Sequence, residues 1–366
     1  MKYRKLGSTG AYVSSLSYGT MFFGGAQWQA TPNPVTREQG LAGLKKAFDL
    51  GINYMDSADL YGAYGNAEKI IGEFIKDYER SDFFISSKTF LPMSPKPNDS
   101  GLSRKHIFES INKSLNRLGT DHIDLYYAHR YDFSTPLEET VVAMNDLIKQ
   151  GKINYWGTSN WESNQLERAY GIANRLGLQG PVVDQAKYSM LQRYSAEVEL
   201  LYTMDYYKLG VVGYKTLCDQ LLTSYYAAKT IKDISQDEII GIARFASSGS
   251  TPDEKATIVL DKMSQLNLLA KELGLEFSQL AIAWVLQNKY ISSAIMSTRN
   301  LSRIEENVKA IDIKIDSDTN QKIESILANE PFPDLSYKYA GYWHNKNLVD
   351  KSLADEDIYP PRPSKF

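Results

Sequence analysis

Short apolar runs and longer amphipathic runs alternate along most of this chain. The first amphipathic run begins at Thr36, where Gln39 completes a capping box, and Gly51 supplies its C-terminal stop. Such a run predicts a helix, and the apolar run 52–55 that follows it predicts a buried strand. The chain therefore opens on a repeating strand-and-helix pattern.

The same two signals recur until the chain has eight of each. Strands are predicted at residues 16–18, 52–55, 83–87, 123–127, 153–156, 182–183, 210–213 and 291–296, and helices at 36–51, 67–76, 103–119, 137–150, 164–176, 277–288, 301–310 and between 183 and 210. Strict alternation indicates parallel strands joined by crossover helices. Eight units favour an α/β fold of one closed (β/α)8 TIM barrel over residues 1–330. The alternative, an open Rossmann-type sheet, requires a G-x-G-x-x-G turn that the sequence lacks.

Three segments lie outside the repeat. Residues 2–13 contain the turn signal Gly-Ser-Thr-Gly between short extended runs, which predicts an N-terminal β-hairpin at the bottom of the barrel. The connection from Tyr214 to about Pro252, after the seventh strand, is long enough to form a lid or a cofactor clamp. Residues 331–366 form a tail rich in proline and aromatic residues, which we expect to pack on the barrel wall or at the mouth of its active site.

Composition and charge narrow the class of protein. The 366 residues carry a formal net charge of −3, from 41 basic and 44 acidic side chains, so no excess charge indicates a nucleic-acid or membrane partner. One cysteine, Cys218, cannot form an internal disulfide, and neither a signal peptide nor a spanning apolar run is evident, so we expect a cytoplasmic protein. The four histidines lack metal-ligand spacing. The oligomeric state is open, and a homo-oligomer is compatible with the sequence.

Polar residues follow the C-terminal ends of several predicted strands, which in a barrel converge on one site. These residues are Asp56 and Tyr61 after strand two, Lys88 after strand three, His129 after strand four, Ser159 and Asn160 after strand five, and Gln185 after strand six. Taken singly, each has a structural alternative, because an Asp–Lys pair or a lone histidine is common in a packed core. Together they suit the reduction of a carbonyl group.

A carbonyl that accepts hydride develops negative charge on its oxygen and needs a positioned acid. The pKa of tyrosine is about 10, and a neighbouring ammonium lowers it. We therefore expect Lys88 to tune Tyr61, Asp56 to fix Lys88, and His129 to donate a hydrogen bond to the substrate oxygen.

Four ordered segments resemble the aldo-keto reductase family. They are DSADLYG at 56–62 with GNAE at 65–68, SK at 87–88, YYAHRYD at 126–132, and GTSNW at 157–161. The resemblance covers roughly residues 3–327 and is nearest to the branch of bacterial aldehyde reductases and potassium-channel β subunits. It implies that Tyr61 is the general acid and base, with Asp56, Lys88 and His129 completing the catalytic set.

The resemblance also implies a nicotinamide site. Ser159, Asn160 and Gln185 would hold the carboxamide, Tyr214 would stack on the ring, and Thr20 and Met21 would lie near the ribose. The family's Ser-Pro-Leu after this tyrosine is replaced by Lys215-Thr216-Leu217, where Lys215 either contacts a phosphate or points to solvent.

Near the last helix, Ser297, Thr298, Arg299 and Arg303 suit an anion at a helix N-terminus, and Glu306 and Asn307 match the adenine side. A 2′-phosphate is the expected anion, so NADP(H) is favoured over NAD(H). The alternative is that both arginines merely lie at an exposed helix start.

The expected function is thus NAD(P)H-dependent hydride transfer to or from an aldehyde, ketone or sugar, with a small carbonyl or alcohol as the partner. Two alternatives stay open: a cofactor-binding regulatory subunit, and a sugar dehydrogenase that works in the oxidative direction. A long N-terminal tail before the barrel would distinguish a regulatory subunit, and from this sequence we expect no such tail.

Overall fold

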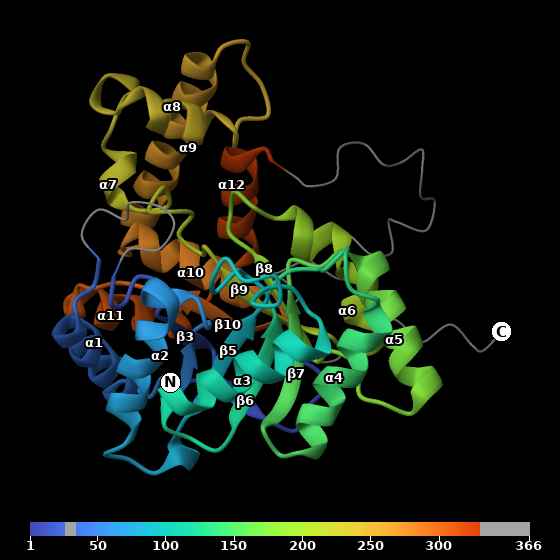
Figure 1. The fold of residues 1–366 in the computed structure, drawn as a ribbon. Helices are drawn as coiled ribbons and strands as arrows, with labels where there is room; N and C mark the ends of the chain where they lie inside the picture. The colour runs from blue at the N-terminus through green and yellow to red at the C-terminus, as the bar shows by residue number, and fades with distance from the viewer. Residues whose placement is uncertain (26–33, 330–366) are drawn as a thin grey trace.

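Eight parallel strands close into a barrel, as the alternating pattern predicts (Figure 1). The computed structural model describes residues 1–25 and 34–329. The barrel strands are β3 (Leu16–Gly19), β4 (Tyr54–Asp56), β5 (Phe84–Thr89), β6 (Ile123–Ala128), β7 (Ile153–Ser159), β8 (Val183–Lys187), β9 (Gly210–Tyr214) and β10 (Ile291–Met296). Neighbouring strands pair in sequence order, and β10 pairs with β3 to close the ring.

Helices surround the barrel, and the first and third of them begin at their predicted caps, Thr36 and Ser103. The helices are α1 (Arg37–Asp49), α2 (Tyr61–Ile75), α3 (Arg104–Leu118), α4 (Leu137–Lys149), α5 (Ser163–Leu176), α6 (Leu201–Tyr207), α10 (Phe277–Gln287), α11 (Leu301–Val308) and α12 (Ser317–Leu327). Thr36 and Gln39 form the expected capping box of α1, and Gly119 ends α3 in a left-handed conformation. The large buried side chains Trp156 and Trp284 belong to the main hydrophobic core.

The N-terminal hairpin lies at the end of the barrel where the strands begin. It consists of β1 (Tyr3–Lys5) and β2 (Tyr12–Ser14), paired antiparallel. Leu6 and Val13 are fully buried in a second hydrophobic cluster, together with side chains from five barrel strands. The Arg4 guanidinium donates hydrogen bonds to the carbonyl oxygens of Ile291 and Leu286, at 2.8 and 2.5 Å. The hairpin therefore seals the bottom of the barrel.

The long connection after β9 is largely helical. It contains α7 (Ser224–Ala227), a 3-10 turn (Ile231–Asp233) and α8 (Gln236–Ala243), and it leads into α9 (Pro252–Glu272). Figure 1 shows α7, α8 and the start of α9 rising above the barrel. Our pattern analysis did not predict α9 or α12, although Thr251 and Glu254 form a recognisable capping box at the start of α9. The predicted 331–366 tail lies outside the described residues.

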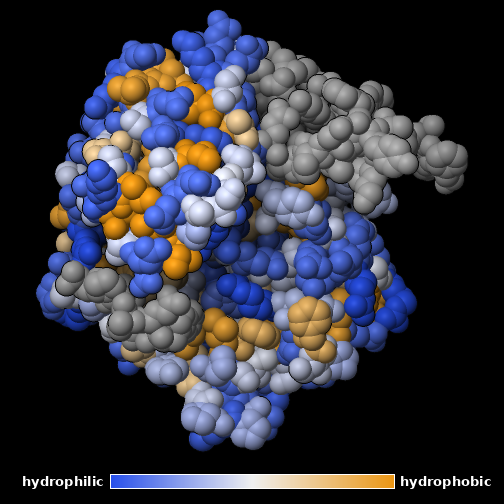
Figure 2. Space-filling model, turned by 90° about the horizontal axis from the view of Figure 1, so that it is seen from above, coloured by the Kyte–Doolittle hydropathy of each residue, from blue (hydrophilic) through white to orange (hydrophobic). Residues whose placement is uncertain are grey.

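Figure 2 shows the molecule from the side on which this extension rises. Hydrophilic residues surround a hollow near the middle of this face, and hydrophobic residues are scattered over the neighbouring extension. The extension thus borders the end of the barrel at which polar strand-end residues are expected.

The hairpin seal is testable through Leu6. We expect Leu6→Ala to lower the free energy of unfolding by about 2–5 kcal/mol, because it removes a fully buried side chain and leaves a cavity. Lys5→Ala, on the same hairpin but exposed, should change it by no more than about 0.5 kcal/mol. Urea denaturation of the three proteins measures both values, and equal stabilities of the two variants would contradict the seal.

Candidate active site

A buried ion pair lies at the centre of the candidate site. Asp56 ends β4 and Lys88 lies in β5, the next strand of the barrel. The Lys88 Nζ donates to Asp56 Oδ1 at 2.7 Å and to the carbonyl oxygen of Ser57 at 2.6 Å. Both charged side chains are almost completely shielded from solvent. The lysine and the aspartate predicted from separate strand ends are therefore in direct contact.

The second oxygen of Asp56 is also occupied. Asp56 Oδ2 accepts a hydrogen bond from Ser86 Oγ at 2.8 Å and another from Gln185 Nε2 at 2.9 Å. Ser86 lies on β5, whereas Gln185 lies on β8, farther around the barrel. The carboxylate is thus held from two sides, and its orientation toward Lys88 is fixed.

Tyr61 lies above this pair because the chain bends sharply after it. Residues 62–65 all have positive φ angles, which interrupt α2 with a left-handed turn. Gly62 is required here, since a Cβ atom would lie 2.2 Å from the carbonyl oxygen of Phe23. The Tyr61 ring centroid is 5.0 Å from Lys88 Nζ and 6.0 Å from the His129 ring, which meets it edge-on. The four predicted catalytic residues are therefore brought together.

Burial controls the protonation of the two rings. It raises the pKa of Tyr61 well above the usual value, the Asp56 carboxylate raises it further, and the positive charge of Arg130 opposes the increase. Burial, Lys88 and Arg130 together lower the pKa of His129 well below its usual value. The net direction for Tyr61 is opposite to the lowering we expected from Lys88, because the cost of dehydrating a phenolate is larger. Tyr61 is a neutral phenol and His129 a neutral imidazole.

The predicted nicotinamide-binding residues form a second cluster beside these rings. Ser159 Oγ donates to the carbonyl oxygen of Gln185 at 3.0 Å and accepts from Asn160 Nδ2 at 2.9 Å. The Tyr214 hydroxyl donates to Asn160 Oδ1 at 2.9 Å. Side chains at the ends of β7 and β9 thus meet each other and the backbone of β8, and they place the Asn160 amide next to the Tyr214 ring, which fits a planar carboxamide-bearing cofactor.

The remaining predicted cofactor residues occupy the ends of β3, β9 and β10. Thr20 is buried and hydrogen-bonds the carbonyl oxygen of Asp56, whereas Met21 is exposed. The Lys215 ammonium pairs with Asp219 at 2.5 Å, and Leu217 packs against the core.

Residues 297–307 surround the start of α11. Ser297, Arg299 and Arg303 are exposed, Thr298 and Glu306 are half-buried, and Asn307 is buried. Asn300, which the pattern analysis did not single out, caps α11 by accepting from the backbone N–H of Ser302. The two arginines, with Ser297 and Thr298, thus lie around the N-terminus of α11, and their binding of an anion stays a prediction.

Comparison with known proteins identifies the family of this chain. The model of the aldo/keto reductase family matches residues 15–328. The chain belongs to the aldo/keto reductase family. That match covers the whole barrel, from β3 to the end of α12.

Curated relatives extend over almost the whole chain. Proteins described as "Probable voltage-gated potassium channel subunit beta" from Oryza sativa subsp. japonica and from Arabidopsis thaliana are each 38% identical over 92% of this chain and 100% of their own length. A "Putative voltage-gated potassium channel subunit beta" from Schizosaccharomyces pombe is 36% identical over 92% of this chain and 96% of its own. No helix among the described residues is long and apolar enough to span a membrane.

Several charged residues lie around the site that the sequence pattern did not predict. Glu68 is fully buried, accepts from Ser87 Oγ and pairs with Arg117 at 2.6 Å. Burial raises the pKa of Asp184, next to Gln185 on β8, to about 6. The positive charge of Arg130, directly after His129, acts on the pKa values of both Tyr61 and His129. Spacing along the chain gives no signal for buried charges whose partners lie on other helices.

Asp59 is the other buried carboxyl that the pattern did not reveal. It accepts from Ser110 Oγ at 2.8 Å, while its Oδ1 has no hydrogen-bond partner among the described residues. Burial, and next the Glu68 carboxylate, raise its pKa to about 7. Asp59 therefore holds a proton through much of the acidic range, two residues from Tyr61.

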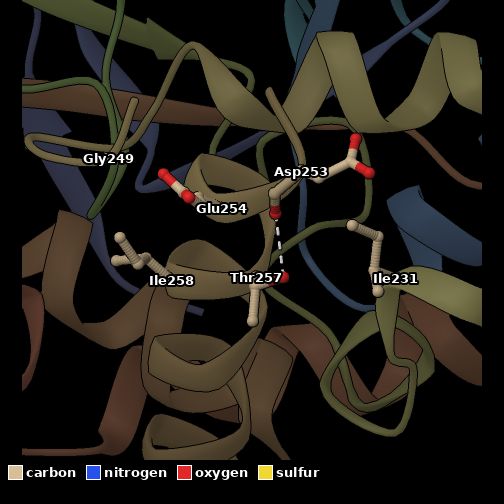
Figure 3. A pocket seen from close by; sticks show the side chains of 6 residues that line it. All are labelled: Ile231, Gly249, Asp253, Glu254, Thr257 and Ile258. Carbon is tan, nitrogen blue, oxygen red and sulfur yellow. Dashed lines mark hydrogen bonds between the residues drawn. The ribbon is translucent and has the colours of Figure 1, made fainter. Parts of the chain in front are cut away.

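A separate hollow lies in the extension, away from these residues. It is lined by Ile231, Gly249, Asp253, Glu254, Thr257 and Ile258 (Figure 3). Thr257 Oγ1 donates to the backbone carbonyl of Asp253, and Glu254 accepts from the backbone N–H groups of residues 250 and 251. These polar groups cap the start of α9. Among the described residues, no group of histidines, cysteines or acidic residues is arranged to hold a metal ion.

Asp59 makes stability depend on pH. The pKa of Asp59 is higher in the folded protein than in the unfolded chain. Its contribution to the free energy of unfolding is therefore most favourable below about pH 4 and is lost as the pH rises toward 7. We expect Asp59→Asn to gain stability relative to the wild type by a few kcal/mol between pH 4.5 and pH 7.5. Urea unfolding at both pH values measures this difference. Parallel pH dependences of the two proteins would show that Asp59 is not protonated in the fold.

Proposed function

We propose that the protein is an NADP(H)-dependent oxidoreductase that transfers hydride between nicotinamide and an aldehyde, ketone or sugar, with Tyr61 as the general acid and base. The observation that carries the proposal is the buried Lys88–Asp56 pair directly beneath Tyr61 and His129. A structural ion pair does not need a phenol and an imidazole placed over it at the open ends of the strands. A carbonyl reduction needs all four groups.

The bound cofactor supplies hydride to the carbonyl carbon. The C=O π electrons move to the oxygen, which takes the proton from the Tyr61 hydroxyl. The Tyr61 hydroxyl makes no hydrogen bond to the described part of the chain, so it is available to the substrate oxygen. His129 donates a second hydrogen bond to that oxygen. The resulting phenolate lies close to the Lys88 ammonium, which stabilises it until a proton returns from solvent.

The cofactor is assigned to the cluster formed by β7, β8 and β9 and to the loops beyond it. Ser159, Asn160 and Gln185 would hold the carboxamide, and Tyr214 would stack on the nicotinamide ring. The other proposed contacts are those of Thr20 and Met21 with the ribose, Lys215 and Leu217 with the pyrophosphate, Ser297, Thr298, Arg299 and Arg303 with the 2′-phosphate, and Glu306 and Asn307 with adenine.

A second candidate function follows from the names of the relatives, which are described as potassium-channel β subunits. In that case the site would bind the cofactor, and the protein would serve mainly as a subunit. NADPH binding without turnover of any carbonyl compound would favour this candidate over the first. The direction of the reaction, including oxidation of a sugar, is a matter for kinetics because the same residues serve both directions.

Tyr61→Phe tests the proton donor. We expect kcat/KM for carbonyl reduction to fall by about 10²- to 10⁴-fold, with NADPH binding retained, because only the transferable proton is removed. Tyr64→Phe is the matched control: this exposed tyrosine is three residues away, and its variant should keep full activity. The measurement is NADPH oxidation across a panel of aldehydes, ketones and sugars. Equal rates for the wild type and Tyr61→Phe on every active substrate would refute the assignment.

Arg299→Ala tests the preference for NADP(H). Loss of one charge-assisted contact to the 2′-phosphate should weaken NADPH binding by about 10- to 100-fold and leave NADH binding unchanged. Fluorescence titration of the purified protein with each cofactor measures both affinities. An unchanged affinity for NADPH would mean that Arg299 only lies at an exposed helix start.

A further inference from the structure

Arg130 places a positive charge beside the proposed substrate-binding groups. It follows His129 at the end of β6 and is half-buried. Its Nη1 donates to the carbonyl oxygen of His129 at 2.5 Å and lies 3.4 Å from Ser159 Oγ. Among the ion pairs of the described residues, Arg130 has no carboxylate partner, in contrast to Arg117 and Arg193, which are also half-buried. Arg130 is thus held in place by neutral oxygen atoms alone.

The charge of Arg130 acts on groups from several sides of the barrel. Burial raises the pKa of Tyr61 after β4 and of Tyr214 at the end of β9, and the Arg130 charge opposes both increases. Burial and Lys88 lower the pKa of His129 after β6, and Arg130 adds to that decrease. It also lowers the pKa of Lys187 at the end of β8. The two hydrogen bonds of Arg130, to residues at the ends of β6 and β7, place its guanidinium at the end of the barrel where the parallel strands end.

A second cation lies at the same end of the barrel. Lys187 ends β8 with its side chain exposed, and it forms no hydrogen bond or ion pair within the described part of the chain. Burial and three neighbouring cations, Lys215, Arg244 and Arg130, lower its pKa, and only Asp219 opposes them. Asp219 pairs with both Lys215 and Arg244, so among the ion pairs of the described residues Lys187 has no carboxylate of its own. A cleft lined by one sign of charge attracts ligands of the opposite sign.

The position of Arg130 separates it from the proposed cofactor phosphates. Those phosphates are assigned to the loops after β9 and β10, whereas Arg130 is adjacent in sequence to His129, the proposed hydrogen-bond donor to the substrate carbonyl. A guanidinium binds carboxylate and phosphate groups through two parallel hydrogen bonds. An anion near His129 would therefore belong to the substrate.

We propose that Arg130, assisted by Lys187, binds an anionic substituent of the substrate, so that the preferred substrates are aldehydes or ketones that carry a carboxylate or phosphate group. This inference rests on the proposed function. It adds a specificity-determining residue to that reaction and assigns to it a class of carbonyl compound.

The test compares three aldehydes of similar shape: benzaldehyde, 4-carboxybenzaldehyde and 4-formylphenyl phosphate. With NADPH, the wild type should show a kcat/KM at least about tenfold higher for one or both anionic aldehydes, and the better of the two identifies the anion. Arg130→Gln should reduce this preference by about 10- to 100-fold, and Arg130→Lys should restore part of it, since the charge returns without the forked geometry. The preference is the ratio of kcat/KM for each anionic aldehyde to kcat/KM for benzaldehyde in the same protein, so a general effect of the Arg130 charge on proton transfer cancels from it.

Arg175→Gln is the matched control, because Arg175 is an exposed arginine at the end of α5 that pairs with Glu138. It should leave the preference intact. Equal kcat/KM values of the wild type for all three aldehydes would overturn the proposal, as would a preference that survives in Arg130→Gln. Weaker NADPH binding by Arg130→Gln with an unchanged preference would assign the guanidinium to the cofactor instead.

A second readout does not depend on turnover. Calorimetric titration with benzoate and with benzamide should show that benzoate binds the wild type more tightly and that Arg130→Gln abolishes the difference. If no aldehyde is reduced, the proposed function fails, and this titration still decides whether Arg130 binds an anion. Equal affinities of the wild type for benzoate and benzamide would then reject the anion site.

Discussion

The buried pair of Lys88 and Asp56 is the interaction on which the candidate site depends. Removing two charges from water costs several kcal/mol for each ion, and their mutual attraction offsets this only when the remaining hydrogen-bonding positions are filled. Here the Ser57 carbonyl oxygen accepts from the lysine, and Ser86 and Gln185 donate to the carboxylate. Because these groups come from β4, β5 and β8, the pair is satisfied only when the barrel is closed.

The same dry environment sets the chemistry of the two rings above the pair. It keeps Tyr61 protonated and His129 neutral, which are the states needed to give a proton to a developing alkoxide and to hold its oxygen. The environment also makes any phenolate costly, so the reaction needs positive charge close to Tyr61. Lys88 supplies it from below, and Arg130 supplies it from the mouth of the barrel. The positive charge of Arg130 is thus proposed to act in two ways, by attracting anionic substrates and by favouring proton transfer from Tyr61.

Membership of the aldo/keto reductase family accounts for the barrel and the order of its motifs. It does not decide between an oxidoreductase and a channel subunit. The relatives described as channel subunits match this chain over nearly their whole length, so an enzyme and a subunit are built on the same framework. Differences between the two roles are expected in loops and insertions. In this chain the α7–α9 extension and the segment after Tyr214 are the parts that depart most from the simple strand-and-helix repeat.

The sequence by itself determined the eight-fold alternation, the closed barrel, the N-terminal hairpin and the set of polar strand-end residues. These features follow from local periodicity and from a topology in which parallel strands end on one face. Only the tertiary structure decided that Gln185 bonds Asp56, that Glu68 pairs with Arg117 in the interior, and that the pKa of Tyr61 rises rather than falls. Burial and contacts between distant elements are produced by packing, and a one-dimensional pattern does not contain them.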